Sequence, residues 1–198
     1  MIDYQLIEKN IEHVQQSWKN IKTTQFSDLY QLKNIFNQEL LNKLQNYLIN
    51  NKNQWTRVEN QEHLNRYNIT FCPDTIIEEL HIITEEGITP LVNQLFGVPE
   101  KNFLGIQIWK DEEGYNLEAH RDNLIIDISL QIYLFDAPLD CGTTFIYKNE
   151  ELAVPYLHNT GYVYCHTNEL TTHKTTRATP PGVTRYSLYS IWSKTAKK

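Results

Sequence analysis

Apolar residues recur at helical spacing through the first half of the chain. The first stripe advances in steps of four and three residues, which places its members on one face of an amphipathic helix. These members are Ile7, Ile11, Val14, Trp18 and Ile21. A short strand is predicted over residues 30–36, and Asn37 then stands where a cap would start a second helix. The apolar stripe of that helix is Leu40, Leu41, Leu44, Tyr47 and Leu48.

Two further helices are predicted before residue 100. Asp74 is placed to cap the first of them. Its inward residues are Ile76, Ile77, Leu80 and Ile83. The second helix is predicted to begin at Thr89 and Pro90, because proline suits the first turn, and to end at Gly97. All of these helices are interpreted as packing elements.

From Phe103 onward the hydrophobic period changes to two, which indicates β-structure. Residues 125–134 show the clearest alternation, with Asp127, Ser129, Gln131 and Tyr133 on one face. The opposite face carries Ile126, Ile128, Leu130, Ile132 and Leu134. Further strands are predicted at 143–147, 162–165 and 184–192, with turn-forming residues between them. One face of this β-structure should therefore meet apolar packing, and the other a polar interior.

Helices first and strands later predict an α+β fold in which N-terminal helices brace one side of a sheet or barrel. A chain of 198 residues with 40% hydrophobic content is enough for one domain with a core. No repeat, low-complexity tract or linker divides it. Residues 1–198 are therefore expected to form a single domain, with a mostly helical support over 1–100 and a β-core over 103–192.

Charge and cysteine content narrow the classes of function. The formal net charge is -6 and the basic residues are spread along the chain, so a nucleic-acid-binding face is not expected. Three cysteines without C-x-x-C spacing favour a reducing compartment over a disulfide framework or a zinc ribbon. The N-terminus does not resemble a signal peptide, and no run approaches the ~20 apolar residues of a bilayer span. The sequence predicts a cytoplasmic protein without a membrane partner, and it does not indicate the oligomeric state.

One short segment has the spacing of metal ligands. His120 and Asp122 are two residues apart, so in an extended segment both side chains project to the same side. A second imidazole from a distant strand would complete a set that leaves open positions on Fe(II). His173 is the predicted third ligand, and His166 is the alternative. Taken alone, the His-x-Asp tripeptide also fits a surface loop, and the segment around His173 fits a polar turn.

A candidate anion site follows. Arg185, Ser187 and Tyr189 share one face of an alternating segment that begins twelve residues after His173. A guanidinium holds a carboxylate through two parallel hydrogen bonds, and a serine hydroxyl two residues on can add a third. The alternative is an ordinary surface arginine beside a strand.

Together these residues resemble the 2-oxoglutarate- and iron-dependent oxygenases, and within them the prolyl-hydroxylase-like branch. The resemblance covers roughly residues 103–192. It rests on His120-x-Asp122 and on residues 131–134 and 141–145, which are similar to the family's Tyr-Leu strand end and its Gly-Gly-x-Thr-x-Phe segment. It also rests on the order in which His173, Gly182, Arg185 and Trp192 follow. Two departures are that Cys141 stands where a glycine is usual, and that the interval from His173 to Arg185 is longer than typical.

The resemblance implies a double-stranded β-helix, a jelly-roll or cupin-like barrel, with Fe(II) held by His120, Asp122 and His173. It implies that 2-oxoglutarate is the co-substrate and that Arg185 pairs with its far carboxylate, assisted by Tyr133 and Ser187. Tyr133 fits this role independently, because it lies on the polar face of its strand, where a phenol can donate a hydrogen bond. The alternative is an ordinary aromatic residue at a strand end.

The implied reaction consumes O2, releases succinate and CO2, and hydroxylates an unactivated C–H of a peptidyl residue, a free amino acid or another small molecule. Because Asp122 retains the carboxylate ligand, the sequence does not resemble the halogenating relatives.

A non-catalytic cupin-like module that binds a metal or a ligand is the alternative function, and Arg185-x-Ser187 argues against it. The substrate is not indicated, because residues for iron and co-substrate are shared by enzymes with different substrates. Arg57 and Arg66 are candidates to meet an acidic substrate, although solvated surface positions are favoured for both. Gln107 and Trp109 are candidates to line the pocket, with core packing as the alternative.

Overall fold

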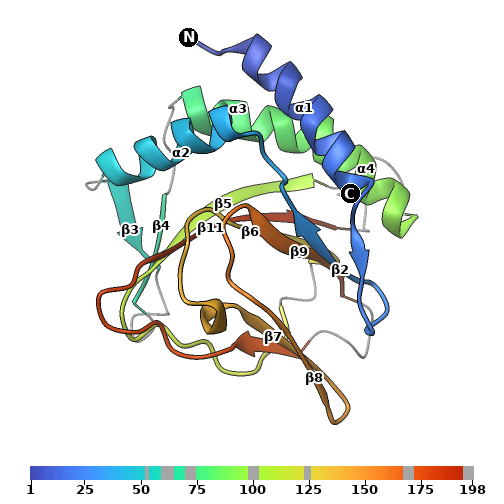
Figure 1. The fold of residues 1–198 in the computed structure, drawn as a ribbon, viewed down its shortest axis with the longest axis vertical. Coiled ribbons are helices and arrows are strands. Elements are labelled where there is room, and N and C mark those ends of the chain that lie inside the picture. The colour runs from blue at the N-terminus through green and yellow to red at the C-terminus, as the bar shows by residue number, and fades with distance from the viewer. Residues whose placement is uncertain are drawn as a thin grey trace.

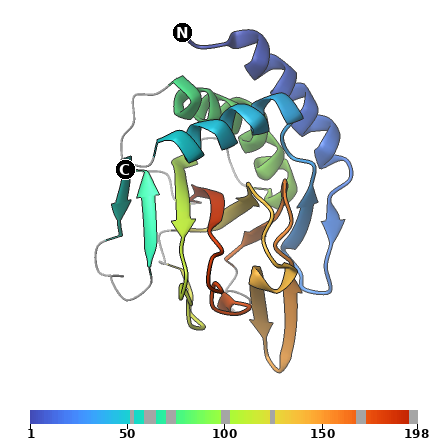
Figure 2. The same ribbon diagram turned by 60° about the vertical axis from the view of Figure 1, so that its left-hand side comes forward.

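The computed structural model describes residues 1–51, 54–58, 65–69, 75–97, 103–122, 126–166 and 172–193. In these residues the chain builds three layers, which Figures 1 and 2 show from two directions. Helices cover one face of a large antiparallel sheet, and a small antiparallel sheet lies against its other face.

The helical layer contains α1 (Tyr4–Trp18), α2 (Gln38–Asn50), α3 (Thr75–Ile82), the π-helical turn η3 (Ile83–Ile88) and α4 (Thr89–Phe96). The predicted cap of α2 is confirmed, because the Asn37 side chain accepts a hydrogen bond from the backbone N–H of Leu40. Gly97 ends α4 in the left-handed region with a φ of 61°, also as predicted. The predicted cap at Asp74 lies outside the described residues.

The predicted helix start at Thr89 is confirmed as the first residue of α4, although α4 continues an earlier helical segment. The backbone of Ile88 is already helical, so α3, η3 and α4 follow one another without a break. Within this continuous helical segment, the side-chain hydroxyl of Thr84 donates to the carbonyl of Leu80 and that of Thr89 donates to the carbonyl of Thr84. Proline at the second position of α4 is tolerated there, so it marks the start of α4 although the preceding turn is already helical.

The large sheet has eight strands among the described residues, in the order β1-β2-β9-β6-β11-β5-β4-β3. They are β1 (Lys22–Thr23), β2 (Leu29–Lys33), β3 (Trp55–Arg57), β4 (Arg66–Ile69), β5 (Phe103–Asp111), β6 (Ile128–Tyr133), β9 (Thr160–Cys165) and β11 (Arg185–Trp192). The small sheet has the order β10-β7-β8. It comprises β7 (Thr143–Tyr147), β8 (Glu150–Val154) and β10 (Thr172–Thr175), and a 3-10 turn η4 (Leu139–Cys141) precedes it.

The first hundred residues contribute to the sheet as well as to the helical layer. The sequence predicts one strand there, but the structure has β1 and β2 at one edge of the large sheet and β3 and β4 at the other. These are short pieces, and β1 and β3 contain only exposed or half-buried residues. A hydrophobic pattern of period two is therefore too weak to reveal them.

Alternation along β6 separates two cores. Ile128, Leu130 and Ile132 pack toward the helices in an aliphatic core. Tyr133 packs the other way, into a second core between the two sheets that is rich in aromatic side chains. The members of this second core are Phe26, Leu29, Tyr133, Cys141, Phe145, Val154, Tyr156, Tyr162 and Tyr164. The predicted apolar and polar faces are thus confirmed within β6, and the polar face lies toward the space between the sheets. Ile126, predicted on the apolar face, precedes β6 and lines the space between the sheets instead.

The α+β class is confirmed by this arrangement of helices and antiparallel sheets. The double-stranded β-helix is not established by it, because the two sheets of the described residues do not close into a barrel. None of the helices in the described part of the chain combines the length and apolar character that a bilayer span requires.

Candidate metal and carboxylate site

The backbone places two histidines side by side. His120 and His173 form an antiparallel bridge in which each backbone N–H donates to the other residue's carbonyl, at 3.0 Å both ways. Directly opposed residues in such a pair project to the same face. Their ring centroids are accordingly 4.3 Å apart. Because β10 also pairs with β7, where His173 lies opposite Phe145, the small sheet holds both imidazoles.

The large sheet holds the carboxylate between them. Oδ2 of Asp122 accepts hydrogen bonds from Tyr164 of β9 at 2.7 Å and Tyr189 of β11 at 3.0 Å, and a longer one from Ser129 of β6 at 3.4 Å. The other oxygen, Oδ1, lies 3.5 Å from His120 Nε2 and 3.7 Å from His173 Nε2. The hydroxyls thus fix one oxygen and turn the other toward the two imidazoles.

These three residues form a possible metal site, because one ligand atom from each lies within 4.8 Å of the others. Two imidazoles and one carboxylate on one side of an ion leave its remaining coordination positions open, as in non-heme Fe(II) sites. The Nδ1 atom of His120 lies 2.9 Å from the carbonyl of Glu118, which orients the ring so that Nε2 faces Asp122.

Electrostatics favour an ionised Asp122 in this cluster. Burial raises the pKa of this carboxyl, but the hydrogen bond from His120, the charge of His173 and the Tyr164 hydroxyl outweigh burial and hold it well below its usual range. Burial lowers the pKa of His120, and its bonds to Asp122 and to the Glu118 carbonyl more than reverse that effect. A carboxylate that stays charged is the form in which it binds a metal.

His166, the alternative third ligand, lies on the other side of the carboxylate. Its Nε2 is 3.5 Å from Oδ2 of Asp122 and 2.9 Å from the Ser129 hydroxyl, and its ring packs against Tyr164 with centroids 4.4 Å apart. It therefore belongs to the group that anchors Oδ2. The sequence names both histidines as candidates, and the structure brings His173 to the side where His120 lies.

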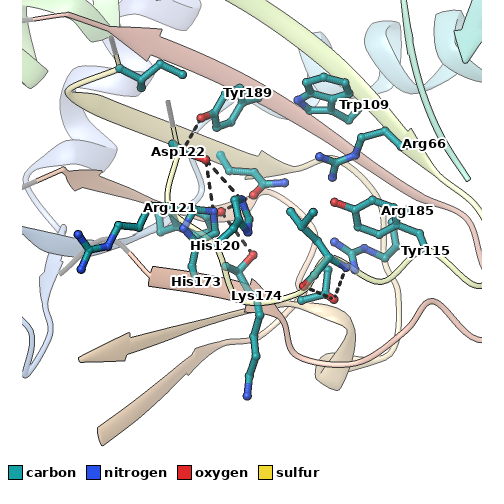
Figure 3. A pocket seen from close by; sticks show the side chains of 16 residues that line it. Arg66, Trp109, Tyr115, His120, Arg121, Asp122, His173, Lys174, Arg185 and Tyr189 are labelled. Carbon is teal, nitrogen blue, oxygen red and sulfur yellow. Dashed lines mark hydrogen bonds and ion pairs between the residues drawn. The ribbon is translucent and has the colours of Figure 1, made fainter. Parts of the chain in front are cut away.

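The cluster of His120, Asp122 and His173 lines a cavity of about 310 Å³ between the two sheets. Figure 3 shows His120, Asp122 and His173 at one end and Arg66, Tyr115 and Arg185 at the other. The lining residues are Arg66, Trp109, Tyr115, Leu117, His120, Arg121, Asp122, Ile126, Gln131, Thr143, Tyr162, His173, Lys174, Thr175, Arg185 and Tyr189.

The far end of the cavity presents hydrogen-bond donors without acceptors. Arg185 is 2% exposed, and its Nε and Nη1 atoms find no hydrogen-bond partner among the described residues. The hydroxyl of Tyr115 is in the same situation. Buried donors without partners cost free energy unless a ligand satisfies them, so this end is suited to a bound carboxylate.

Tyr133 and Ser187, predicted to assist Arg185, lie one layer behind the cavity wall. The hydroxyl of Tyr133 is 3.0 Å from that of Thr143, and Ser187 accepts a hydrogen bond of 2.9 Å from the side-chain amide of Gln131. Thr143 and Gln131 line the cavity, whereas Tyr133 and Ser187 are not among its lining residues. Both predicted residues are therefore linked to the cavity indirectly, each by a hydrogen bond to a residue that lines it.

The structure also decides the positions of the other candidate pocket residues. Trp109 lines the cavity, and Gln107 is exposed elsewhere on β5. Arg57 is exposed, as favoured, but the solvated position favoured for Arg66 is wrong, because its side chain is 12% exposed and ion-paired. Tyr115 gives no signal in the sequence, because it lies in an irregular segment without a periodic pattern.

Comparison of the sequence with models of protein families and with curated proteins finds no match. Solved structures do match. A prolyl hydroxylase from Trichoplax adhaerens, in complex with a hypoxia inducible factor peptide, has a TM-score of 0.69 at 12% identity, covering 98% of this chain and 94% of that chain. An oxidoreductase of the 2OG-Fe(II) oxygenase family from Burkholderia pseudomallei has a TM-score of 0.67 at 12% identity, covering 98% and 93%. The alpha-ketoglutarate-dependent epimerase SnoN of nogalamycin biosynthesis has a TM-score of 0.65 at 10% identity, covering 96% and 84%.

This chain has the fold of the 2-oxoglutarate- and Fe(II)-dependent oxygenases. The family resemblance predicted from the sequence is therefore confirmed at the level of the fold, with prolyl hydroxylases among the matching structures.

Within this oxygenase fold, the two ends of the cavity fit two different groups. The imidazoles of His120 and His173 with the carboxylate of Asp122 are a donor set that suits Fe(II). The unpaired, buried guanidinium atoms of Arg185 suit one carboxylate of a dicarboxylic acid. The residues present therefore fit both the metal and the co-substrate that such oxygenases use.

Proposed function

We propose that this protein is an Fe(II)- and 2-oxoglutarate-dependent dioxygenase that hydroxylates an unactivated C–H bond. The observation that carries the proposal is a single cavity with the cluster of His120, Asp122 and His173 at one end and, at the other, the Nε and Nη1 atoms of Arg185, which have no hydrogen-bond partner among the described residues. A metal-binding module alone has no need for a buried arginine with free donors, because such donors are costly without a ligand.

His120, Asp122 and His173 would hold the iron. Iron bound there would supply the activation of O2 that couples the decarboxylation of 2-oxoglutarate, to succinate and CO2, with oxidation of the substrate. Tyr164, Tyr189 and Ser129 keep Oδ2 of Asp122 occupied. Their role is to present Oδ1 to the metal and to fix the orientation of the carboxylate.

Arg185 would bind the far carboxylate of 2-oxoglutarate through Nε and Nη1, and the Tyr115 hydroxyl would add a donor from the same end. Burial raises the pKa of Tyr115 above its ordinary value, so its hydroxyl stays protonated and able to donate. Tyr133 and Ser187 would act as supports, since they bond to Thr143 and Gln131 in the cavity wall.

On this proposal, the two sheets are the two faces of a double-stranded β-helix and residues 1–198 form one domain. The order of the strands supports this interpretation, because the small sheet lies against the open face of the large one (Figure 1).

The substrate would be a peptidyl residue, a free amino acid or another small molecule. Two matching structures support a peptide or a small-molecule substrate, since one contains a hypoxia inducible factor peptide and another contains 2-oxoglutarate with hygromycin B. Because an epimerase shares the fold, hydroxylation is the part of the proposal that needs a direct product assay.

The test is succinate formation by the purified protein with Fe(II), 2-oxoglutarate and O2. It is combined with substrate-dependent O2 consumption across proline-containing peptides and free amino acids, and hydroxylated product is identified by mass. We expect activity in the wild type and in Arg177→Ala, which removes an exposed arginine paired with Asp140 at 3.0 Å. Asp122→Ala is expected to abolish it. A folded, iron-loaded wild type that forms no succinate with any substrate of the panel would instead support the non-catalytic binding module.

A further inference from the structure

Three charged residues lie in a row across the large sheet at the far end of the cavity, where Arg185 lies. Asp111 of β5 stands directly opposite Arg66 on β4 and directly opposite Arg185 on β11. Directly opposed residues of antiparallel strands project to the same face. The register of these three strands therefore forces one carboxylate between two guanidinium groups, and Figure 3 shows both arginines facing the cavity.

The carboxylate is shared unequally between the two arginines. Arg66 forms a bidentate pair with it, donating from Nε to Oδ1 at 2.6 Å and from Nη2 to Oδ2 at 3.0 Å. Arg185 reaches it only through Nη2, at 3.6 Å from Oδ2. Two short charge-assisted bonds are stronger than one long contact, so Asp111 pairs mainly with Arg66.

Arg66 is itself held in place by aromatic rings. Its guanidinium carbon lies 4.7 Å from the ring centroid of Trp109 and 4.3 Å from that of Tyr115. Burial alone would lower the pKa of Arg66, but the charge and hydrogen bonds of Asp111 together with Tyr115 and Tyr162 outweigh burial and keep the pKa above the ordinary value. The group therefore remains a fixed cation beside Asp111.

The row carries one net positive charge, because two arginines face one aspartate. Asp111 and Arg185 are 1% and 2% exposed, so water does little to screen this charge. A buried charge is costly unless it is paired. One bound carboxylate would neutralise the row.

We propose that Arg66 is a positioning residue for the co-substrate: by engaging Asp111, it prevents Asp111 from neutralising Arg185 and leaves Arg185 free to bind a carboxylate. This inference rests on the proposed function, since it concerns the same 2-oxoglutarate site. Without Arg66, the buried carboxylate of Asp111 has Arg185 as the nearest cation in the row, and the two would close into a neutral pair. Arg185 would then be occupied from within the protein.

The experiment measures binding, without turnover, by calorimetry in the absence of O2. The probes are 2-oxoglutarate with the metal-loaded protein and glutarate with the metal-free protein, since glutarate keeps both carboxylates but lacks the keto group that chelates iron. The variants are Arg66→Gln, Asp111→Asn and the double variant, with Arg177→Gln as the control at an exposed arginine.

Arg66→Gln is expected to weaken the binding of both probes roughly ten- to a hundredfold. Arg185 would then pair with Asp111, and the carboxylate of the probe would lose its charge-assisted bonds to Arg185. The double variant is expected to return to within about threefold of the wild type, since the amide that replaces the Asp111 carboxylate carries no charge to compete for Arg185. Asp111→Asn alone is expected to bind at least as tightly as the wild type. Arg177→Gln should not change either affinity.

The outcomes separate this inference from the proposed function. A wild type that binds neither probe would overturn the proposed function, and the inference with it. Binding in the wild type together with wild-type affinity in Arg66→Gln, or with no recovery in the double variant, would overturn only the role of Arg66. If Arg66→Gln does not fold, Asp111→Asn still decides, because weaker binding in that variant means that Asp111 helps Arg185 and does not compete for it.

Discussion

Replacing Arg185 with alanine tests the carboxylate end of the cavity most directly. The substitution removes Nε and Nη1, the two donors that have no partner among the described residues. A hydrogen bond to a charged group contributes about 1.5–3 kcal/mol, so two such bonds correspond to roughly 3–5 kcal/mol of binding free energy once incomplete additivity is allowed for. At about 1.4 kcal/mol per factor of ten, the affinity for 2-oxoglutarate should fall roughly a hundredfold to several thousandfold.

The fold should survive this change. Asp111 keeps its two bonds to Arg66, at 2.6 and 3.0 Å, so the buried carboxylate is not left unpaired in Arg185→Ala. Metal binding should survive too, because Arg185 does not belong to the candidate metal site of His120, Asp122 and His173. The loss is therefore expected to be specific to the co-substrate.

The assay is calorimetric titration of 2-oxoglutarate into the metal-loaded protein under anaerobic conditions, with metal affinity and urea unfolding measured on the same preparations. Arg177→Ala is the control, since that arginine is exposed and pairs with Asp140 on the surface. An affinity for 2-oxoglutarate in Arg185→Ala within threefold of the wild-type value, in a folded protein that still binds metal, would refute the assignment of Arg185.

Three further predictions concern the metal anchor, the sheet and alkaline pH. Tyr164→Phe removes a 2.7 Å bond to Asp122 and should weaken Fe(II) binding roughly tenfold in a metal titration; unchanged affinity would mean that this hydroxyl does not orient the carboxylate. Gly161→Ala would bring a Cβ to 1.8 Å from a backbone oxygen of β6 and should lower the free energy of unfolding in urea by about 3 kcal/mol. Gly97→Ala, with a φ of 61° in open space, should cost only about 1–2 kcal/mol, so equal losses would contradict the close approach of β9 and β6. Burial raises the pKa of Tyr133 from 10.0 to about 12; the stability from keeping this phenol protonated is complete below pH 10 and declines as pH rises through 12. Phenolate absorbance and urea unfolding at each pH check this, and ionisation of Tyr133 near pH 10 in the folded protein would show that its ring is accessible.

Local patterns predicted the elements whose side chains divide cleanly between an apolar and a polar face. The stripes around Val14 and Leu44 correspond to α1 and α2, and the alternation around Leu130 corresponds to β6. Both helices are stabilised by burying their apolar face, and β6 buries its apolar face in the aliphatic core and its polar face between the sheets, so the pattern in the sequence is also the cause of the structure. Edge strands such as β3, which bury little, leave no comparable pattern.

The proposed site rests on a different kind of sequence signal. The spacing of His120 and Asp122 is local, and an extended chain turns such residues to the same side whatever surrounds them. The choice between His166 and His173 is not local, because it depends on which residue of β10 pairs with the backbone of His120. That register is a property of the assembled sheet.

The sequence by itself determined the α+β class, the apolar and polar faces of its main elements, and the residue types that suit iron and a carboxylate. Only the tertiary structure decided which of those residues meet. Arg66 is far from Asp111 and Arg185 in sequence, yet strand register places the three in one row. Side-chain periodicity records which face a residue occupies, but pairing between distant strands is decided by how all the faces pack together.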